Sequence, residues 1–173
     1  MNRGMNHGRR RDRGQALPEF ALIAPLFFLL LFGIIQIGLI MASQNGLVNA
    51  VRDSTRKAAT YRVNELTFAS TTVCSDIDAQ LLSDLATSIP GFVAANLTSD
   101  ISYEWGQNPD SSQWFVVAHV EARYKNVLYV PLISFFLDRV DGTADDHLEL
   151  YAGEQMRIEN PALEAPASTT DPC

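Results

Sequence analysis

The chain has 173 residues, with 13 basic and 20 acidic side chains and a net charge of −7. Five Arg fall within residues 1–14, so the remainder holds eight basic and 19 acidic residues, a net charge of −11. Such an acidic remainder argues against nucleic acid as a partner, because phosphate binding needs clustered Lys and Arg. The two cysteines form no Cys-x-x-Cys pair and there are only three His, which argues against a zinc site.

Residues 20–42 form an uninterrupted hydrophobic segment. None of these 23 residues is charged, and the only strongly polar one is Gln36. A helix rises ~1.5 Å per residue, so about 20 residues cross a hydrocarbon core of ~30 Å. The run exceeds the ~7–15-residue apolar region of a cleavable secretory signal. Because it is apolar on all faces and follows an Arg cluster, it predicts a transmembrane helix rather than a buried core helix.

The basic leader, residues 1–14, sets the expected orientation of that helix. Positively charged flanks stay in the cytoplasm, so we expect a cytoplasmic N-terminus and a domain on the far side of the membrane. A free basic tail could bind nucleic acid, but Arg beside an apolar run is more typical of an orientation signal. Four basic residues after the span weaken the bias, although they lie ten or more residues past its edge: Arg52, Arg56, Lys57 and Arg62.

Glu19 stands directly before the hydrophobic segment, where a carboxylate has two interpretations. It can lie at headgroup level and stay solvated, because the cost of ~2.5–3.5 kcal/mol for a charge at the helix centre falls near the interface. Alternatively, cleavage after Gly14 would make Gln15 a new N-terminus, whose α-amino group has a pKa near ~8. The ammonium of a neighbouring subunit could then neutralise Glu19 in the low-dielectric membrane. Cleavage would also remove the Arg leader that resists extraction from the bilayer.

This pattern resembles type IV prepilins, and more specifically the TadE-like family of minor pilins or pseudopilins from tight-adherence (Flp) pili. That family typically opens with Gly-x-Ala-x-x-Glu-Phe-Ala-Leu followed by a Pro. Pro18 departs from the pattern but suits the first turn of a helix. Residues 156–159 also resemble the family's closing strand. The matching positions are Gly14, Ala16, Glu19, Phe20, Ala21, Leu22 and Pro25.

The resemblance implies a set of partners and a location. It implies a prepilin peptidase that cuts between Gly14 and Gln15, and a role for Glu19 in assembly. It also implies contacts with other pilin-like subunits and the pilus assembly machinery. The location would be the bacterial inner membrane as a single-pass protein, or the pilus after assembly. The implied architecture is a long N-terminal helix, half in the bilayer and half packed on a small exported domain.

After the span, helical periodicity continues and then changes. Residues 44–62 are expected to extend the membrane helix, with a softer joint at 41–46 because Asn and Gly are poor helix formers. A loop is expected over 63–75, and Ser75 with Asp78 resembles a capping box for a second helix. The apolar positions of that helix predict a core face, and Pro90-Gly91 ends it: Ile77, Leu81, Leu82, Leu85 and Ile89.

Beyond residue 100 the period becomes two, which predicts strands. We expect one strand at 101–105, a turn at 108–111, and a second strand at 113–124. A third strand is expected at 147–158, with a bulge at Gly153 and Met156 pointing inward. The inward face of the second strand would be Trp114, Val116, Ala118, Val120 and Ala122. The sequence therefore predicts an α+β fold with an antiparallel sheet of three to four strands.

Two further segments are interpreted by composition. Residues 127–137 are very apolar, and we expect a short helix after Pro131 that either joins the core or forms a contact patch. Residues 141–146 are expected to be a solvated loop. The expected organisation is a leader at 1–14, a transmembrane helix at 15–43, an exported domain at 44–159, and a disordered Pro-rich tail at 160–173.

The remaining candidate chemistry is limited. His119 and His147 each precede a Glu by two residues, but no nucleophile motif or third partner accompanies them. We therefore expect no catalytic residue, no metal and no cofactor. Cys74 and Cys173 could form a disulfide in an exported domain. Two alternatives stay open: a buried free thiol at Cys74, and a bond between subunits.

Two functions compete. The first is a pilin-like structural or assembly subunit that is processed after Gly14. The second is an uncleaved, signal-anchored exterior protein with a binding or sensing role. An enzyme is the third and weakest hypothesis, because no active-site residues stand out. Processing after Gly14 separates the first two.

Overall fold

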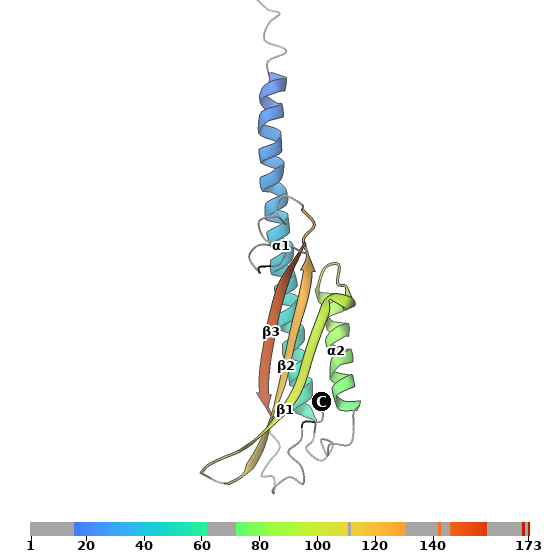
Figure 1. Ribbon diagram of the computed structural model, residues 1–173, viewed down its shortest axis with the longest axis vertical. Helices are drawn as coiled ribbons and strands as arrows, with labels where there is room; N and C mark the ends of the chain where they lie inside the picture. The colour runs from blue at the N-terminus through green and yellow to red at the C-terminus, as the bar shows by residue number, and fades with distance from the viewer. Residues whose placement is uncertain are drawn as a thin grey trace, which may run out of the picture.

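The computed structural model describes residues 16–61, 72–110, 112–130, 142, 146–158, 171 and 173 (Figure 1). A long helix, α1, is followed by a second helix and a sheet, which confirms the predicted α+β fold. The elements in chain order are α1 (Ala16–Thr60), α2 (Thr72–Ser88), the short 3₁₀ helix η1 (Ala94–Asn96), β1 (Leu97–Gln107), β2 (Trp114–Val127) and β3 (His147–Arg157).

α1 is a single helix of 45 residues. It runs without a break through 41–46, so no softer joint forms there. The side chains in this stretch explain why, because Ser43, Gly46 and Leu47 are buried against the rest of the domain. Packing therefore overrides the poor helix propensity of Asn45 and Gly46. The first half of α1 projects beyond the domain, and the second half lies within it (Figure 1).

The three strands form one antiparallel sheet in the order β1-β2-β3. The pairing of β2 with β3 is continuous, with Glu121 opposite Gly153 and Ala122 opposite Ala152. The predicted bulge at Gly153 is therefore wrong. The glycine instead leaves room for a neighbour on its own face, since a Cβ there would lie 2.6 Å from the Tyr151 hydroxyl oxygen.

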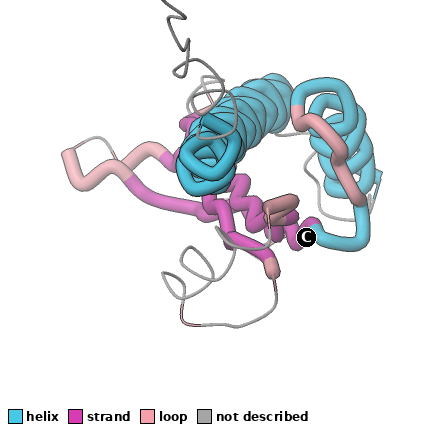
Figure 2. The backbone as a smooth tube through the Cα atoms, turned by 90° about the horizontal axis from the view of Figure 1, so that it is seen from above, coloured by secondary structure: helices cyan, strands magenta, loops and turns pink. Residues whose placement is uncertain are grey.

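Both helices lie on the same side of the sheet (Figure 2). The core between the layers holds four of the five predicted inward residues of β2, which alternate with exposed or half-buried ones, whereas Trp114 is only half-buried. The predicted stripe of α2 is also buried, apart from the half-buried Leu82. The confirmed core positions are Val116, Ala118, Val120, Ala122, Ile77, Leu81, Leu85 and Ile89.

The start of α2 differs from the expectation. The helix begins at Thr72, so residues 72–75 are not part of a loop. The Ser75 hydroxyl donates a hydrogen bond to the carbonyl of Thr72 at 2.9 Å, inside the first turn. Asp78 accepts a hydrogen bond from the Ser99 hydroxyl at 2.6 Å and so links α2 to β1. The proposed capping box is wrong because both side chains have other partners.

Other expectations fall at the ends of the sheet. The turn after β1 is present, where the Asn108 side-chain oxygen accepts the Asp110 N–H at 3.1 Å. Leu150, Ala152 and Ile158 are buried, but Met156 is 38% exposed, because it lines an open hollow beside the end of α1. The expected helix after Pro131 lies outside the described residues, as does most of 141–146.

Candidate functional site: the apolar half of α1 and its junction with the domain

The first half of α1 exposes large apolar side chains over its surface. By length and composition, α1 is the one helix in the described part of the chain that could cross a membrane. Such exposure is costly in water, so this half requires lipid or other apolar helices around it. The exposed side chains are Phe20, Leu22, Ile23, Leu26, Phe27, Phe28, Leu29, Leu30, Leu31, Phe32, Ile34, Ile35 and Ile37.

Glu19 lies in the first turn of α1 and is exposed. It is the only charged residue between Ala16 and Val51. A carboxylate near a helix N-terminus interacts favourably with the partial positive charge of the unpaired N–H groups. Its exposure at the end of the helix far from the domain leaves it accessible to a neighbouring chain. Gly14 and Gln15 lie outside the described residues.

The junction between the two halves is marked by Gln36, which is only 1% exposed. Its side-chain oxygen accepts a hydrogen bond from the backbone N–H of Tyr129, just after β2, at 3.0 Å. This bond ties the domain to the helix inside the hydrophobic segment. The sequence analysis assigned no role to Gln36, although a lone amide in an uncharged run of 23 residues was the available signal.

The second half of α1 belongs to the domain core. Leu47, Val51 and Ala58 are fully or almost fully buried. Two basic residues of this half have partners in the domain. Arg52 pairs with Glu154 of β3 at 3.9 Å, and the Lys57 ammonium donates to the Asp76 carbonyl at 3.1 Å.

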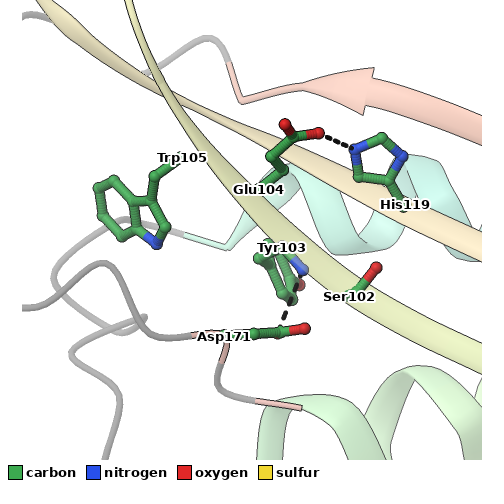
Figure 3. A pocket seen from close by; sticks show the side chains of 6 residues that line it. All are labelled: Ser102, Tyr103, Glu104, Trp105, His119 and Asp171. Carbon is green, nitrogen blue, oxygen red and sulfur yellow. Dashed lines mark hydrogen bonds and ion pairs between the residues drawn. The ribbon is translucent and has the colours of Figure 1, made fainter.

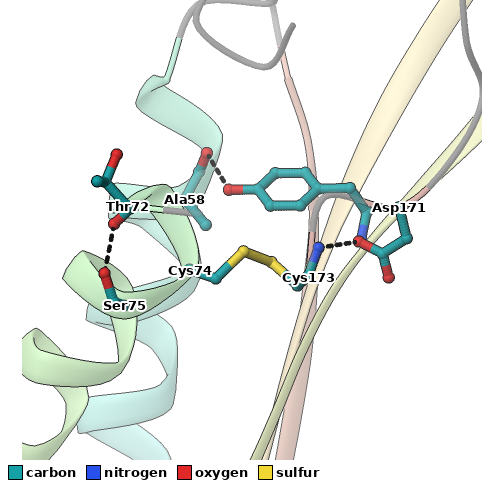
Figure 4. Close-up of a disulfide and its surroundings, with 7 residues drawn as sticks. Ala58, Thr72, Cys74, Ser75, Asp171 and Cys173 are labelled. Atoms are coloured by element: carbon teal, nitrogen blue, oxygen red, sulfur yellow. Dashed lines mark hydrogen bonds between the residues drawn. A yellow bond between two sulfur atoms is a disulfide. The ribbon is translucent and has the colours of Figure 1, made fainter. Parts of the chain in front are cut away.

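The end of the chain meets the first turn of α2 and the open edge of β1 (Figure 4). The structure joins Cys74 to Cys173, with their Cα atoms 5.7 Å apart. The Asp171 carboxylate accepts the backbone N–H groups of Tyr103 at 3.2 Å and of Cys173 at 3.0 Å. It therefore occupies a donor of β1, which among the described strands pairs on one side only, with β2. Formation of the disulfide in the exported protein stays a prediction.

Tyr103 is the buried residue of this region. Its hydroxyl donates to the Ala58 carbonyl at 3.4 Å, which connects β1 to the last turn of α1. Burial raises the pKa of Tyr103 well above its usual range, and Tyr61 and Asp171 raise that pKa further. The phenol therefore stays neutral in the folded protein at all ordinary pH values.

A hollow beside this contact holds the histidine that the sequence singled out (Figure 3). His119 Nε2 lies 3.4 Å from a carboxylate oxygen of Glu104 on β1, a cross-strand contact that is an ion pair only when the imidazole is protonated. Among the described residues, no group of three His, Cys, Asp or Glu side chains is placed to hold a metal ion. The hollow is lined by Ser102, Tyr103, Glu104, Trp105, His119 and Asp171.

Residues 14–56 match the family model described as TadE-like protein. The N-terminal helix is TadE-like. The resemblance is confirmed over the exposed half of α1, the junction at Gln36 and most of the packed half. The TadE-like segment ends before α2 and the sheet begin. No curated protein and no solved structure gives a significant match to the chain.

Proposed function

We propose that this protein is a minor pilin-like, TadE-like structural or assembly subunit of a tight-adherence pilus. One observation supports it most directly. The TadE-like segment coincides with a helix whose first half is apolar and exposed while its second half is packed into a domain. A helix of this construction can anchor the domain to the bacterial inner membrane as a monomer. The same exposed side chains can pack against neighbouring helices in an assembly.

The charge distribution supports a cytoplasmic N-terminus and an extracytoplasmic domain. The Arg-rich leader precedes the hydrophobic segment directly. The basic residues after the segment are less able to compete, because Arg52 and Lys57 contact the domain. Arg52 also lies ten residues past Ala42, which is about 15 Å along the helix.

Processing after Gly14 completes the proposal. A prepilin peptidase would remove the leader and give Gln15 a free α-amino group. In an assembly, that ammonium would meet the exposed Glu19 of a neighbouring subunit, and the contact would strengthen in a low-dielectric surrounding. Other pilin-like subunits and the assembly machinery are the proposed partners. The proposed role is structural and needs no cofactor.

N-terminal mass spectrometry of the membrane-extracted protein tests the proposal. In cells with a working prepilin peptidase, we expect the mature chain to begin at Gln15. Gly14→Val should block processing, whereas Gly8→Val, in the same leader, should not. An intact Met1 in the wild-type chain would contradict the proposal and favour an uncleaved, signal-anchored protein with a binding or sensing role.

A further inference from the structure

Two segments meet at the end of the domain from which the apolar half of α1 emerges (Figure 1). One is the turn after α2, residues 89–96, and the other is residues 128–130, which follow β2. They are close to each other, because a Cβ on Gly91 would lie 2.6 Å from the Tyr129 hydroxyl oxygen. The Tyr129 backbone N–H in turn bonds Gln36 of α1. We call these two segments the near end of the domain.

The near end is uncharged and partly apolar at its surface. No Asp, Glu, Lys or Arg occurs in residues 85–99 or 126–130. Tyr129 is 57% exposed and Val93 is 44% exposed. The turn also presents Pro90 and Gly91 to the surface. In a chain with a net charge of −7, these two segments form a stretch of surface without formal charge, which suits contact with an apolar or interfacial partner.

The length of the exposed helix identifies that partner. Residues 20–35, from the start of the apolar run to the last residue before the junction, extend over only about 24 Å, whereas the hydrocarbon core is ~30 Å thick. A span that starts at Phe20 therefore reaches the far boundary about four residues beyond Ile35. The Gln36–Tyr129 hydrogen bond lies within about one helical turn of that boundary. The near end must consequently approach the bilayer at least as closely as its headgroup layer.

We propose that the near end is seated in the interfacial layer of the extracytoplasmic leaflet, with Tyr129 at headgroup level. Aromatic rings with a polar tip concentrate at this depth. The Gln36 oxygen accepts the Tyr129 N–H, so neither of these two groups is unpaired near hydrocarbon, whereas the Gln36 amide nitrogen is buried without a partner among the described residues. Asp146, exposed at the start of β3, accepts the Leu128 N–H through its carbonyl at 3.0 Å. Its carboxylate limits the depth to the hydrated headgroup layer.

This interfacial position of the near end would hold the domain in a fixed orientation relative to the membrane. The inference rests on the membrane anchor of the proposed function but not on processing or on pilus assembly. The unbroken α1 supports such a fixed geometry, because no joint separates the exposed half from the packed half.

Depth-dependent fluorescence quenching tests whether the near end lies in the interfacial layer. The full chain is reconstituted in phosphatidylethanolamine–phosphatidylglycerol vesicles with Trp105 and Trp114 replaced by Phe. The reporter is Tyr129→Trp, and the control is Tyr151→Trp. Tyr151 is 50% exposed, and its carbonyl bonds Gln44, which lies eight residues beyond Gln36 in α1. The control therefore lies about 12 Å farther along the helix.

We expect lipids brominated near the headgroup to quench Tyr129→Trp at least twofold more strongly than Tyr151→Trp. A Val93→Trp reporter should behave like Tyr129→Trp, which guards against disruption of the Gln36 contact by the first substitution. Equal, weak quenching of all three would overturn the proposal. Weak quenching that strengthens as the protein is diluted in the vesicles would also overturn it, since another subunit rather than lipid would then cover the near end.

The outcomes separate this inference from the proposed function. If the Tyr129→Trp reporter is quenched in a chain that is never cut after Gly14, the interfacial position of the near end is supported and the pilin function is contradicted. If the chain is cut but the reporter is not quenched, the pilin function is supported and the interfacial position is contradicted.

Discussion

The backbone of Gly46 in α1 lies directly against the backbone of Ser88 at the end of α2. A Cβ on Gly46 would lie 2.9 Å from the Ser88 carbonyl oxygen and 3.1 Å from its carbonyl carbon. The Ser88 Cβ would also lie only 3.1 Å away. This close approach fixes the end of α2 against the packed half of α1.

Gly46→Ala should therefore destabilise the domain. Inserting a methyl group into a packed contact typically costs about 1–3 kcal/mol. Gly38→Ala is the matched control, because nothing lies within 4 Å of a Cβ there. The control should be neutral or slightly stabilising, since Ala is the better helix former. Urea unfolding of the detergent-solubilised chain, followed by fluorescence of the domain tryptophans, measures both. Equal midpoints for the two variants would contradict a tight contact.

Local pattern was sufficient to predict the sheet and the helices. The alternation in β2 indicated which side of the strand is buried, because the side-chain period of a strand is two. The stripe of α2 likewise followed from helical spacing, with Ile77, Leu81 and Leu85 all fully buried. The membrane helix followed from its length and lack of charge, which are properties of composition alone.

Features that depend on tertiary contact could not be predicted. Gly153 was interpreted as a bulge because local sequence does not reveal its continuous pairing with Glu121 of β2, 32 residues away. Ser75 and Asp78 matched a capping pattern, but Ser99, 21 residues from Asp78, competes for that carboxylate. The Gln36 oxygen accepts the N–H of Tyr129, 93 residues away, so the lone amide stands out in the sequence but its partner could not be predicted. In each case a distant partner determined the outcome.

Because Tyr103 is buried, we expect the free energy of unfolding to fall at alkaline pH. The pKa of Tyr103 is raised in the folded state, chiefly by burial, above the value of 10.0 for an unperturbed tyrosine. The unfolded chain therefore releases this proton at lower pH than the folded chain does. The contribution of Tyr103 to stability is complete below about pH 10 and is lost as pH rises further.

Tyr103→Phe should remove this pH dependence. At pH 8 the variant should lose about 0.5–1.5 kcal/mol or less, because it gives up one long hydrogen bond to Ala58. Between pH 8 and pH 10.5 its unfolding free energy should fall less than that of the wild type. Tyr151→Phe, at an exposed position, is the control. Parallel pH profiles for the wild type and Tyr103→Phe would show that this phenol does not cause the alkaline loss.

The Cys74–Cys173 bond is expected to form in the exported protein and to stabilise it. The two residues are 99 positions apart, and closing so long a loop stabilises by up to ~4.7 kcal/mol in the chain-entropy model. Cys74→Ser, Cys173→Ser and the double variant should lose similar amounts of unfolding free energy, because each removes the same bond. Ser75→Ala, in the same turn of α2, is the control and should change little.

Non-reducing peptide mapping checks the pairing itself. A linked peptide pair containing Cys74 and Cys173 is the expected product, and it should disappear on reduction. A Cys74 peptide that alkylates freely without reductant would mean that the bond does not form. A reducible dimer would indicate that the cysteines pair between subunits instead.

Glu19→Ala is expected to spare processing and membrane insertion but to impair assembly. Removing the carboxylate lowers the insertion cost, which is on the order of 2.5–3.5 kcal/mol at a helix centre and less near the interface. What is lost is the partner for the α-amino group of a neighbour's Gln15. The measurements are N-terminal mass spectrometry, carbonate extraction of membranes, and the amount of protein in sheared pili.

Glu19→Gln separates charge from size, because it keeps the shape of the side chain and removes its charge. We expect Glu19→Gln to fail in assembly as Glu19→Ala does, and Glu19→Asp to retain part of it. Normal amounts of assembled protein in Glu19→Gln would show that the carboxylate charge is not what the neighbouring subunit recognises.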